Sequence, residues 1–444
     1  MGEGSVVGVG LIGFGTIGTG VVKVLAENAD VISERLGFSL KLVRVADLDT
    51  ETDRGVSLDG VVFDSNASGL IHDPAVDIVI ELVGGYDIAK RFILEAISAG
   101  KHVVTANKAL LALHGKEIFK AADAQGVDVL FEAAVGGGIP ILRSLREGLA
   151  ANHIQSVVGI LNGTTNFVLT EMERCGEPFE VVLKRAQELG YAEADPTFDV
   201  DGIDAAHKLA LLTGMAFGAE LTFEDIPTEG IRNLAPIDME IAGELGFRIK
   251  LLGIARAHRG AGGEERIEAR IHPTMVPISS MLANVDAAMN AVEVRGDAVG
   301  PTLYYGAGAG EMPTASAVVA DLMEIAREKQ RGGAGPVSPL SYRPEALAQK
   351  SLVSLGEVRG RSYVRFSAVD RPGCLAGIAA ALAEEGVGIE SLVQRSTGAG
   401  LADVPVIVVT HPAEDHALRR ALANIDASGA VTATSVALRI EEEL

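Results

Sequence analysis

One stretch of the chain, AQELGYAEADPTFDVDGIDAAHK (186–208), has five carboxylates within twelve residues and a lysine at its end. These carboxylates are Glu193, Asp195, Asp199, Asp201 and Asp204, and the lysine is Lys208. A desolvated lysine can exchange a proton near neutral pH, and carboxylates are natural partners of an ammonium group. The stretch could therefore bind an amino-acid substrate and catalyse proton transfer.

The elements that carry these side chains follow from the residues between them. Gly190 and Pro196 interrupt the first half of the stretch, which is therefore expected to be a loop. After Gly202 the apolar residues return with helical spacing, and they predict a helix that ends at Gly214. The acidic residues should thus lie on a loop and on the first turn of the helix that follows it.

Asp204 and Lys208 are four residues apart, so the predicted helix places them on one face. A simpler alternative assigns them no chemistry. Asp201 and Asp204 would then cap the helix, and Asp204 and Lys208 would form a surface ion pair worth roughly 0.2–0.5 kcal/mol. The spacing by itself leaves both alternatives open.

The composition is that of a globular α/β protein of two or three domains. The chain has 444 residues, 48% of them hydrophobic, and 52 glycines, which suit many tight strand-to-helix turns. Its formal net charge of −22 disfavours binding to nucleic acid or to an anionic membrane. Two cysteines make no disulfide framework, no apolar run approaches the ~18 residues of a membrane span, and a signal pattern is lacking. These features predict a cytoplasmic protein.

A glycine-rich turn near the N-terminus predicts dinucleotide binding. Residues 5–12 are an expected strand and residues 19–29 an expected helix. The spacing Gly-x-Gly-x-x-Gly occurs in two overlapping registers, and only the second leaves a strand of normal length before it. That register comprises Gly13, Phe14, Gly15, Thr16, Ile17 and Gly18. Such a turn lets the backbone approach a pyrophosphate at a helix N-terminus, although glycine turns can also serve packing alone.

The next expected strand, residues 41–47, ends at Asp47, where a Rossmann fold places the acid that binds the adenosine ribose. The interval from the glycine turn exceeds the usual ~20 residues, which implies a long helix and loop between them. An acid at this position favours the 2′-hydroxyl of NAD over the 2′-phosphate of NADP. Arg44 and Arg54 are close enough in sequence to leave NADP open.

Apolar runs at residues 77–85, 102–105 and 127–133 alternate with helical segments and predict a doubly wound parallel sheet. Lys108 follows the second run, at the carboxyl end of a strand, where such sheets bind ligands. A solvated helix start is the alternative for this lysine. The segment 131–140, FEAAVGGGIP, then joins the Glu132 carboxylate to a loop of three glycines. Its oxygen atoms could hold a hard cation, or the loop could be a plain turn.

The second half of the chain has a different pattern. Expected strands near 247–258, 265–273 and 291–296 indicate a mixed sheet with helices on one face. Residues 328–351 are rich in proline and glycine and predict a linker. The apolar runs beyond it follow the order βαββαβ, which is typical of a ferredoxin-like module.

Motifs in three regions resemble known families. The stretch 186–208 resembles, element by element, the pattern A-x3-G-Y-A-x2-D-P-x2-D-V-x-G-x-D-x3-K of homoserine dehydrogenases, and TANKALLA (105–112) is similar to another of their motifs. The turn DRPGCL (370–375) resembles that of the ACT domain, which commonly senses amino acids. The resemblance implies a Rossmann coenzyme domain over 1–150 completed by 304–327, a substrate and dimerisation domain over 151–303, a linker over 328–360 and an ACT domain over 361–444.

The resemblance also implies an activity, the reversible NAD(P)-dependent reduction of L-aspartate 4-semialdehyde to L-homoserine, in threonine and methionine biosynthesis. Lys208 would be the general acid/base at the C4 oxygen, and Lys108 would polarise the same oxygen. The substrate would be bound, or its loop shaped, by Glu193, Asp204, Asp199 and Gly190.

Coenzyme and cation contacts are implied in the same way. Besides the turn at 13–18 and Asp47, the coenzyme would be contacted by Thr105, Lys108 and Gly308. Related enzymes often carry a basic residue just before the acid, where this chain has Ala46, and this difference favours NAD. A monovalent cation, taken as Na⁺, would be held by Glu132 and the backbone oxygens of Val135, Gly137 and Ile139.

For the ACT domain, the N–H groups around Gly373 at a helix N-terminus are the expected seat of an effector's α-carboxylate. The segment 387–391 would close over that effector, for which L-threonine is the expectation. It would act through association of ACT domains in a homo-oligomer, a dimer or a tetramer. The alternative is that the module only joins subunits.

Two other functions remain open on the sequence. An aspartate-semialdehyde dehydrogenase would need an activated cysteine, and Cys175 has no histidine near it in sequence. A non-enzymatic amino-acid sensor on a dehydrogenase-like scaffold is disfavoured, because no residue of the motif has been lost.

Overall fold

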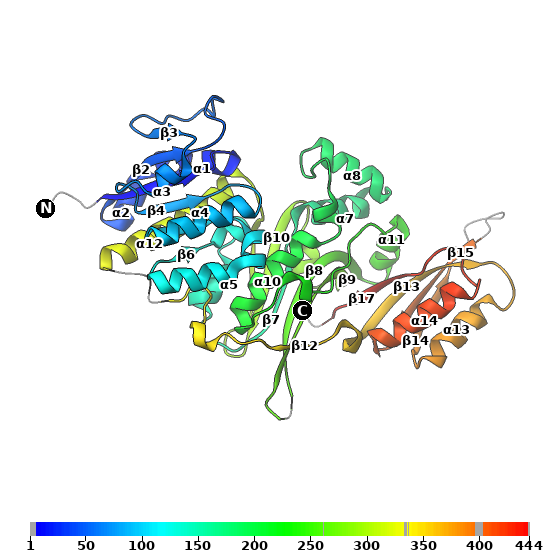
Figure 1. Cartoon of the computed structure of the whole chain (residues 1–444). Helices are drawn as coiled ribbons and strands as arrows, with labels where there is room; N and C mark the ends of the chain where they lie inside the picture. Colours follow the sequence, from blue (N-terminus) through cyan, green and yellow to red (C-terminus); the bar gives the residue numbers. More distant parts are fainter. Residues whose placement is uncertain (1–5, 261, 333–334, 336, 396–402, 443–444) are drawn as a thin grey trace. The chain divides into compact units, whose positions relative to one another are not determined.

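The computed structural model describes residues 6–260, 262–332, 335, 337–395 and 403–442 (Figure 1). Ser5, the first residue of the expected N-terminal strand, lies outside these residues, as do positions 333, 334 and 336 of the expected linker. The chain forms two compact units. The first comprises residues 1–157, 207–225 and 289–349, and the second comprises residues 158–206, 226–288 and 350–444.

The first unit contains a six-stranded sheet in the order β3-β2-β1-β4-β5-β6, with every pair parallel. Its strands are β1 (Val6–Ile12), β2 (Ser39–Ala46), β3 (Val62–Asp64), β4 (Ile78–Glu81), β5 (His102–Thr105) and β6 (Val129–Leu130). Strand order reverses direction at β1, which pairs with β2 on one side and with β4 on the other. The predicted doubly wound parallel sheet is therefore confirmed, and its ligand crevice is expected outside the carboxyl ends of β1 and β4.

Helices pack on this sheet and complete its core. They are α1 (Thr16–Glu27), α2 (Ala29–Leu36), α3 (Ala67–Ile71), α4 (Asp87–Ser98), α5 (Lys108–Gln125), α6 (Ile141–Arg143) and α12 (Glu311–Arg331). The core joins Leu11 of β1, Val21 of α1 and Leu322 of α12. A Cβ on Gly20 would lie 3.1 Å from the Ala315 Cβ, so glycine lets α1 and α12 pack closely. A helix from late in the chain thus supports the N-terminal sheet.

Several element bounds differ from the expectation, among them the following three. The run 127–133 forms strand only at β6, because a 3-10 helix (Glu132–Ala134) takes over its second half. The helix expected to end at Gly214 is α10 (Ile203–Phe217), which continues to Phe217 because helices tolerate a single glycine. α12 ends at Arg331, beyond residue 328 where the linker was expected to begin.

The second unit is built on antiparallel hairpins. Its strands are β8 (Phe247–Arg259), β9 (Glu265–Pro277), β12 (Ser351–Leu352), β13 (Arg359–Val369), β14 (Ile389–Gln394), β15 (Asp403–Thr410), β16 (Ala413–Glu414) and β17 (Val436–Ile440). Its helices are α7 (Gly163–Cys175), α8 (Phe179–Glu188), α9 (Thr197–Val200), α11 (Pro236–Glu244), α13 (Cys374–Glu384) and α14 (Asp415–Ala427). The remaining strands are β7 (Ile154–Ile160), β10 (Met289–Gly296) and β11 (Gly300–Ala307), the last two forming an antiparallel hairpin.

The last part of this unit has the predicted ferredoxin-like order. β13, α13, β14, β15, α14 and β17 follow one another as βαββαβ, and the strands lie in the order β17-β13-β15-β14. α13 and α14 pack together on one face of these strands (Figure 1), around Phe366, Ile378 and Leu418. β17 also pairs in parallel with β9, so this module shares one sheet with the β8–β9 hairpin.

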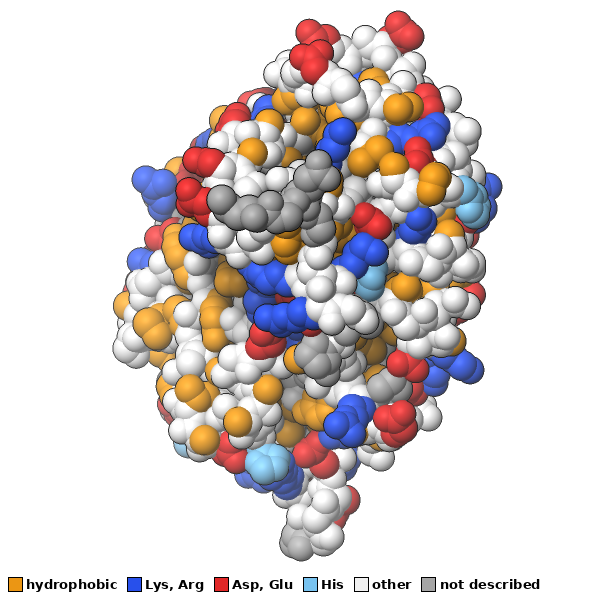
Figure 2. All heavy atoms as spheres, turned by 90° about the vertical axis from the view of Figure 1, so that its left-hand side faces the viewer, with side chains coloured by type: hydrophobic (Ala, Val, Ile, Leu, Met, Phe, Trp, Pro, Cys, Tyr) orange, Lys and Arg blue, Asp and Glu red, His pale blue; other side chains and the backbone are white. Residues whose placement is uncertain are grey.

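No helix among the described residues is long and apolar enough to cross a membrane. On the face of the molecule drawn in Figure 2, acidic and basic side chains are interspersed with apolar ones. Over the whole chain acidic residues outnumber basic ones, and the formal net charge is −22.

Candidate functional site

The glycine-rich turn lies between β1 and α1 of the first unit. Gly13 has φ +96°, and a Cβ on it would lie 2.7 Å from the Leu82 carbonyl oxygen, so a larger residue is excluded. A Cβ on Gly18 would lie 2.3 Å from the Gly13 carbonyl oxygen. The space above Gly15 is open, and within the described part of the chain no side chain caps the N-terminus of α1. Its first N–H groups can therefore receive a pyrophosphate, so the turn fits a dinucleotide.

Asp47 holds this turn from the end of β2. One carboxylate oxygen accepts a hydrogen bond from the Phe14 N–H (2.5 Å), and the other accepts one from the Asp49 N–H (2.8 Å). Arg54 lies beside it, with its Nη2 atom 3.8 Å from Asp47 Oδ1 and its guanidinium 4.8 Å from the centre of the Phe14 ring. Arg44 is turned towards Asp64 instead, at 2.5 Å. Of the two arginines, only Arg54 neighbours the expected ribose site.

The carboxyl ends of β4 and β5 carry a polar cluster beside Lys108. The Thr105 hydroxyl donates to the Glu81 carboxylate (2.7 Å) and accepts from the Asn107 N–H (3.1 Å). The Asn107 side chain accepts from the Leu110 N–H and so caps α5, whose first residue is Lys108. Burial raises the pKa of Glu81 to about 7. Lys108 is thus fixed at the end of a parallel strand, where the sequence pattern predicts it.

Glu132 lies in a buried carboxyl pair. Its oxygens accept hydrogen bonds from the Leu142 N–H (2.9 Å) and the Arg143 N–H (2.7 Å), and its own N–H donates to Asp321 (2.7 Å). Burial raises the pKa of Glu132. Burial and then the neighbouring Glu132 charge raise the pKa of Asp321 to about 8.

This pair is chemically suited to a nearby cation, which would offset the charge that burial disfavours. The described residues contain no group of three His, Cys, Asp or Glu side chains that could hold a metal ion. A cation beside Glu132 would therefore depend on backbone oxygens. One of the expected ligands, the Ile139 carbonyl, accepts a hydrogen bond from the Ile141 N–H (2.8 Å), and carbonyls have a second lone pair.

The loop after Glu132 packs directly on the end of β11. The Gly138 N–H donates to the Ala307 carbonyl (3.1 Å), and a Cβ on Gly137 would lie 2.6 Å from the Gly308 carbonyl oxygen. The structure therefore brings the expected cation loop and the expected coenzyme contact Gly308 together. Asn290 lies against Gly308, and its buried Oδ1 has no hydrogen-bond partner among the described residues.

α10 carries Asp204 and Lys208 one turn apart, as the spacing predicts. Asp204 is 4% exposed and Lys208 is 8% exposed. The alternative of a surface ion pair is wrong, because both side chains are buried. Burying a lysine and a carboxylate costs free energy. Proteins therefore keep such residues in the interior where catalysis or the surrounding contacts require them.

Asn162 joins two of the acidic residues in the second unit. Its Oδ1 accepts from the Thr165 N–H (2.8 Å) and so caps α7, while its Nδ2 donates to Asp199 (2.7 Å) and to Asp204 (2.9 Å). The amide thus fixes two carboxylates that would otherwise repel each other. The expected loop also contains a short helix, α9, on which Asp199 lies.

The first part of the acidic stretch is held mainly through its backbone. The Tyr191 ring stacks on Phe167 at 4.5 Å, and its carbonyl accepts from the Thr164 hydroxyl (2.6 Å). Gln187 donates to the Glu193 carbonyl (3.0 Å), and the Glu193 side chain is exposed. Gly190 has φ +79°, which glycine adopts readily at the end of a helix. The structure places Asp199 and Asp204 together around Asn162, and it leaves Glu193 at the surface.

The ACT-like module has a cavity of about 320 Å³ at the N-terminus of α13. Its lining includes Asp370, Arg371 and Gly373, which is the N-cap of α13 with φ +88°. From β14 the lining residue is Gln394, rather than any of residues 387–391, which were expected to close over a ligand. The closure expected from residues 387–391 involves a pair of ACT modules, so it stays a prediction.

Sequence reasoning missed Asn162, Glu81 and Asp321 as parts of these sites. The polar turn NGTT (162–165) after an apolar strand marks Asn162 as a helix cap, but not as a donor to residues about forty positions later. A charged residue inside the apolar run 77–85 was a signal for Glu81. Asp321 lies in a helix with an ordinary amphipathic pattern, which gives no signal.

Three family models match the chain. They are "Homoserine dehydrogenase, NAD binding domain" over residues 13–132, "Homoserine dehydrogenase" over residues 140–323, and "ACT domain" over residues 362–427.

Full-length relatives agree with these matches. The homoserine dehydrogenase of Neisseria gonorrhoeae is 47% identical, and that of Pseudomonas aeruginosa is 46% identical, with 98% of this chain and 98% of each relative aligned. The solved homoserine dehydrogenase of Thiobacillus denitrificans superposes with a TM-score of 0.92 at 47% identity, covering 99% of both chains. That of S. aureus superposes with a TM-score of 0.75 at 28% identity, covering 99% of this chain and 100% of the other.

Proposed function

This chain belongs to the homoserine dehydrogenase family, and we propose that the site residues described above divide its reaction between them. The reaction is the reversible, nicotinamide-dependent reduction of L-aspartate 4-semialdehyde to L-homoserine. The observation that best supports these roles is the cluster formed by Asn162, Asp199 and Asp204. Its member Asp204 lies one turn of α10 before the buried Lys208.

In this proposal Lys208 is the general acid/base at the substrate C4 oxygen, and Lys108 polarises that oxygen. Burial favours the neutral form of a lysine, so Lys208 could accept the proton of the homoserine hydroxyl and return it to the aldehyde oxygen. The nicotinamide, when bound, supplies or accepts the hydride. Asp204 and Glu193 bind the ammonium and hydroxyl groups, while Asp199 and Gly190 shape the loop. Asn162 holds the Asp204 carboxylate in place by a hydrogen bond, whereas the exposed Glu193 side chain would have to move towards the substrate.

The coenzyme would bind along the turn 13–18, with Thr105, Lys108 and Gly308 at its nicotinamide end and Asp47 at its ribose end. We expect NAD to be used at least as well as NADP. Ala46 is buried and adds no charge, and Arg54 already donates to the carbonyl oxygens of Thr52 and Asp49. A kcat/KM for NADP more than roughly tenfold above that for NAD, about 1.4 kcal/mol, would reverse this expectation.

A monovalent cation, Na⁺, would be held by Glu132 with the backbone oxygens of Val135, Gly137 and Ile139. The buried Glu132–Asp321 pair supports this part of the proposal, because a cation would offset its charge. The contact of Gly137 with Gly308 would carry the cation's effect to the coenzyme. The cation would thus order a loop and would take no part in the proton transfer.

Regulation is proposed at the ACT cavity. An α-carboxylate at the N-terminus of α13 would meet the N–H groups after Gly373, with Arg371 nearby. L-threonine, an end product of the route, is the proposed inhibitor, acting through association of ACT domains in a homo-oligomer, a dimer or a tetramer. We also propose cytoplasmic localisation, which the two unpaired cysteines favour. The proposed domains are the coenzyme domain over 1–150 with 304–327, the substrate and dimerisation domain over 151–303, the linker over 328–360 and the ACT domain over 361–444.

The deciding experiment is homoserine-dependent reduction of NAD⁺ and NADP⁺ by the purified protein. Lys208→Ala should lose kcat by roughly 10²–10⁴-fold with little change in coenzyme affinity, since a positioned acid contributes about that much. Lys116→Ala, which removes an exposed lysine from α5, is the control and should keep full activity. Near wild-type turnover in Lys208→Ala would reject the assignment.

The same assay tests the substrate carboxylates. Glu193→Gln should act mainly on the KM for homoserine, whereas Asp204→Asn should raise that KM and also lower kcat through Lys208. An unchanged homoserine KM in both variants would place the substrate elsewhere. A protein that binds amino acids but reduces no coenzyme would instead be the non-enzymatic sensor.

A further inference from the structure

A short segment of the second unit, residues 227–232, joins the β-sheet to the acidic stretch; we call it the bridge segment. On the sheet side it pairs with β9 like an added strand. The Ile271 N–H donates to the Pro227 carbonyl (2.9 Å), and the Glu229 N–H donates to the Ile271 carbonyl (2.8 Å). Thr228 and Ile271 form a parallel β-bridge. The backbone of the bridge segment is therefore fixed to the middle of β9.

On its other side the bridge segment supports the turn between α9 and α10. The Ile231 N–H donates to the Val200 carbonyl (2.9 Å), and a Cβ on Gly230 would lie 2.4 Å from that same oxygen. Arg232 donates to the Asp201 carboxylate (2.5 Å). This turn lies between Asp199 and Asp204, so a shift of the bridge segment would move both carboxylates.

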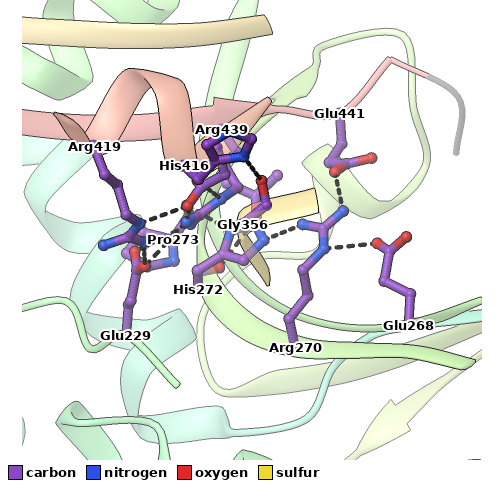
Figure 3. A network of polar contacts seen from close by, with 12 residues as sticks. Glu229, Glu268, Arg270, His272, Pro273, Gly356, His416, Arg419, Arg439 and Glu441 are labelled. Atoms are coloured by element: carbon purple, nitrogen blue, oxygen red, sulfur yellow. Dashed lines mark hydrogen bonds and ion pairs between the residues drawn. The ribbon is translucent and has the colours of Figure 1, made fainter. Parts of the chain in front are cut away.

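The Glu229 side chain points towards the arginines of the ACT module (Figure 3). It accepts hydrogen bonds from Arg419 of α14 and from both Nη atoms of Arg439 of β17, the latter at 3.1 Å. Both arginines are also held by Asp415, which lies 2.5 Å from Arg419 Nε and 2.9 Å from Arg439 Nε. Burial raises the pKa of Glu229, but the hydrogen bonds and charges of the two arginines outweigh it and lower the pKa. Glu229 is therefore a charged anchor.

The module that supplies these arginines is itself firmly seated. Arg270 of β9, 1% exposed, donates to Glu441 just after β17 (2.5 Å) and to Glu268 (2.7 Å), as Figure 3 shows. Breaking one partner of a buried charged pair is costly, because it leaves the other charge uncompensated. The ACT module and β9 thus present Arg419 and Arg439 to Glu229 from a rigid base.

We propose that Glu229 is a positioning residue for homoserine binding, through which the ACT module holds the acidic stretch in its substrate-binding geometry. The chain of contacts runs from Arg419 and Arg439 to Glu229, through the bridge segment to Val200, and so to Asp199 and Asp204. The inference rests on the proposed substrate role of these two carboxylates. It makes the ACT module part of the scaffold of the substrate site.

Glu229→Gln tests this inference, because it keeps the shape of the side chain and removes its charge. The KM for homoserine should rise roughly tenfold, which corresponds to about 1.4 kcal/mol, with the coenzyme KM unchanged. Arg419→Gln, which removes the more exposed of the two arginines, should give a smaller rise, and the double variant should be less than additive. Arg420→Gln is the matched control: it breaks an ion pair with Glu385 inside the ACT module and should leave the homoserine KM unchanged.

Hydrogen exchange supplies a readout that does not depend on activity. In Glu229→Gln the amide of Ile231, bonded to Val200, should exchange faster, while amides in β13 keep their protection. If Glu229→Gln does not fold, Arg419→Gln carries the test. A homoserine KM within about twofold of wild type in Arg419→Gln and in any folded Glu229→Gln would overturn the inference, provided that Asp204→Asn raises this KM. If Asp204→Asn leaves it unchanged, the proposed substrate site has failed instead.

Discussion

Asn162 is the residue whose replacement should reveal most about the substrate site. Its side chain has two functions, because Oδ1 caps α7 and Nδ2 donates hydrogen bonds to both Asp199 and Asp204. Asn162→Ser keeps an oxygen that can cap the helix, but its hydroxyl has a single hydrogen and cannot donate to both carboxylates as the Asn162 amide does. Asn162→Ala removes both functions, so the two variants separate the cap from the bridge.

The magnitudes follow from the contacts. Loss of the cap costs about 1 kcal/mol, and a hydrogen bond to a charged group contributes about 1.5–3 kcal/mol. Because the two carboxylates share one donor, their contributions do not add fully. We expect Asn162→Ser to lose about 2–3 kcal/mol of stability and Asn162→Ala about 3–4 kcal/mol. In both variants the carboxylates repel each other and move apart, so the homoserine KM should rise by roughly tenfold or more.

The assay combines thermal unfolding with steady-state kinetics for each substrate. Asn66→Ala is the control, because Asn66 caps α3 through the Gly69 N–H (2.8 Å) and lies outside the acidic site. It should lose stability without changing the homoserine KM. If Asn162→Ser folds and its homoserine KM stays within about twofold of wild type, Asn162 is only a helix cap and the reasoning is refuted.

Three further predictions concern a titration, the cation and the effector. Burial and the Glu132 charge raise the pKa of Asp321 to about 8, so the native protein keeps a proton that the unfolded chain releases at about pH 4; stability should fall as the pH rises from about 4 to about 8 and level off above that, and Asp321→Asn should flatten the decline of Tm between about pH 5 and 8. A decline as steep as in wild type would contradict this. Glu132→Gln should abolish any activation by Na⁺ and any rise of Tm with Na⁺, measured against a choline salt of equal ionic strength; a cation response that survives would place the ion elsewhere. L-threonine at millimolar concentration should raise the KM or lower kcat, and Gly373→Asp should abolish that effect, because a carboxylate at this positive φ would crowd and repel the ligand; no change of kinetics or Tm in wild type would show that the module answers to another ligand or is structural.

Much of the fold could be predicted because its signals are local. The glycine turn, the apolar runs of the parallel sheet and the βαββαβ order of the last module all depend on residues within about thirty positions. The strands expected near 247–258 and 265–273 are confirmed as β8 and β9 for the same reason. Errors occurred where tertiary contacts override the pattern: in the run 127–133 the strand ends at Leu130, and the 3-10 helix that follows begins at Glu132, whose carboxylate accepts hydrogen bonds from the N–H groups of Leu142 and Arg143.

The site was predictable only in part, because its side chains are paired over long distances in sequence. Asp204 and Lys208 could be placed on one helical face from their spacing alone. The bond from Asn162 to Asp204 and that from Arg439 to Glu229 join residues 42 and 210 positions apart, and no periodicity reports such pairs. The pKa of Asp321 likewise depends on burial and on Glu132, which lies 189 positions away.

The pairing of β17 with β9 also sets the order in which this protein can be completed during translation. About 165 residues separate Met275 from Ile440, the partners in that ladder. At about 5–20 residues per second, the edge of β9 waits roughly 8–30 s for its neighbouring strand. During that interval Arg270 lacks Glu441, and an open β-edge is a template for wrong pairing. Variants that weaken β17 should therefore lower the yield of native protein before they change its kinetics.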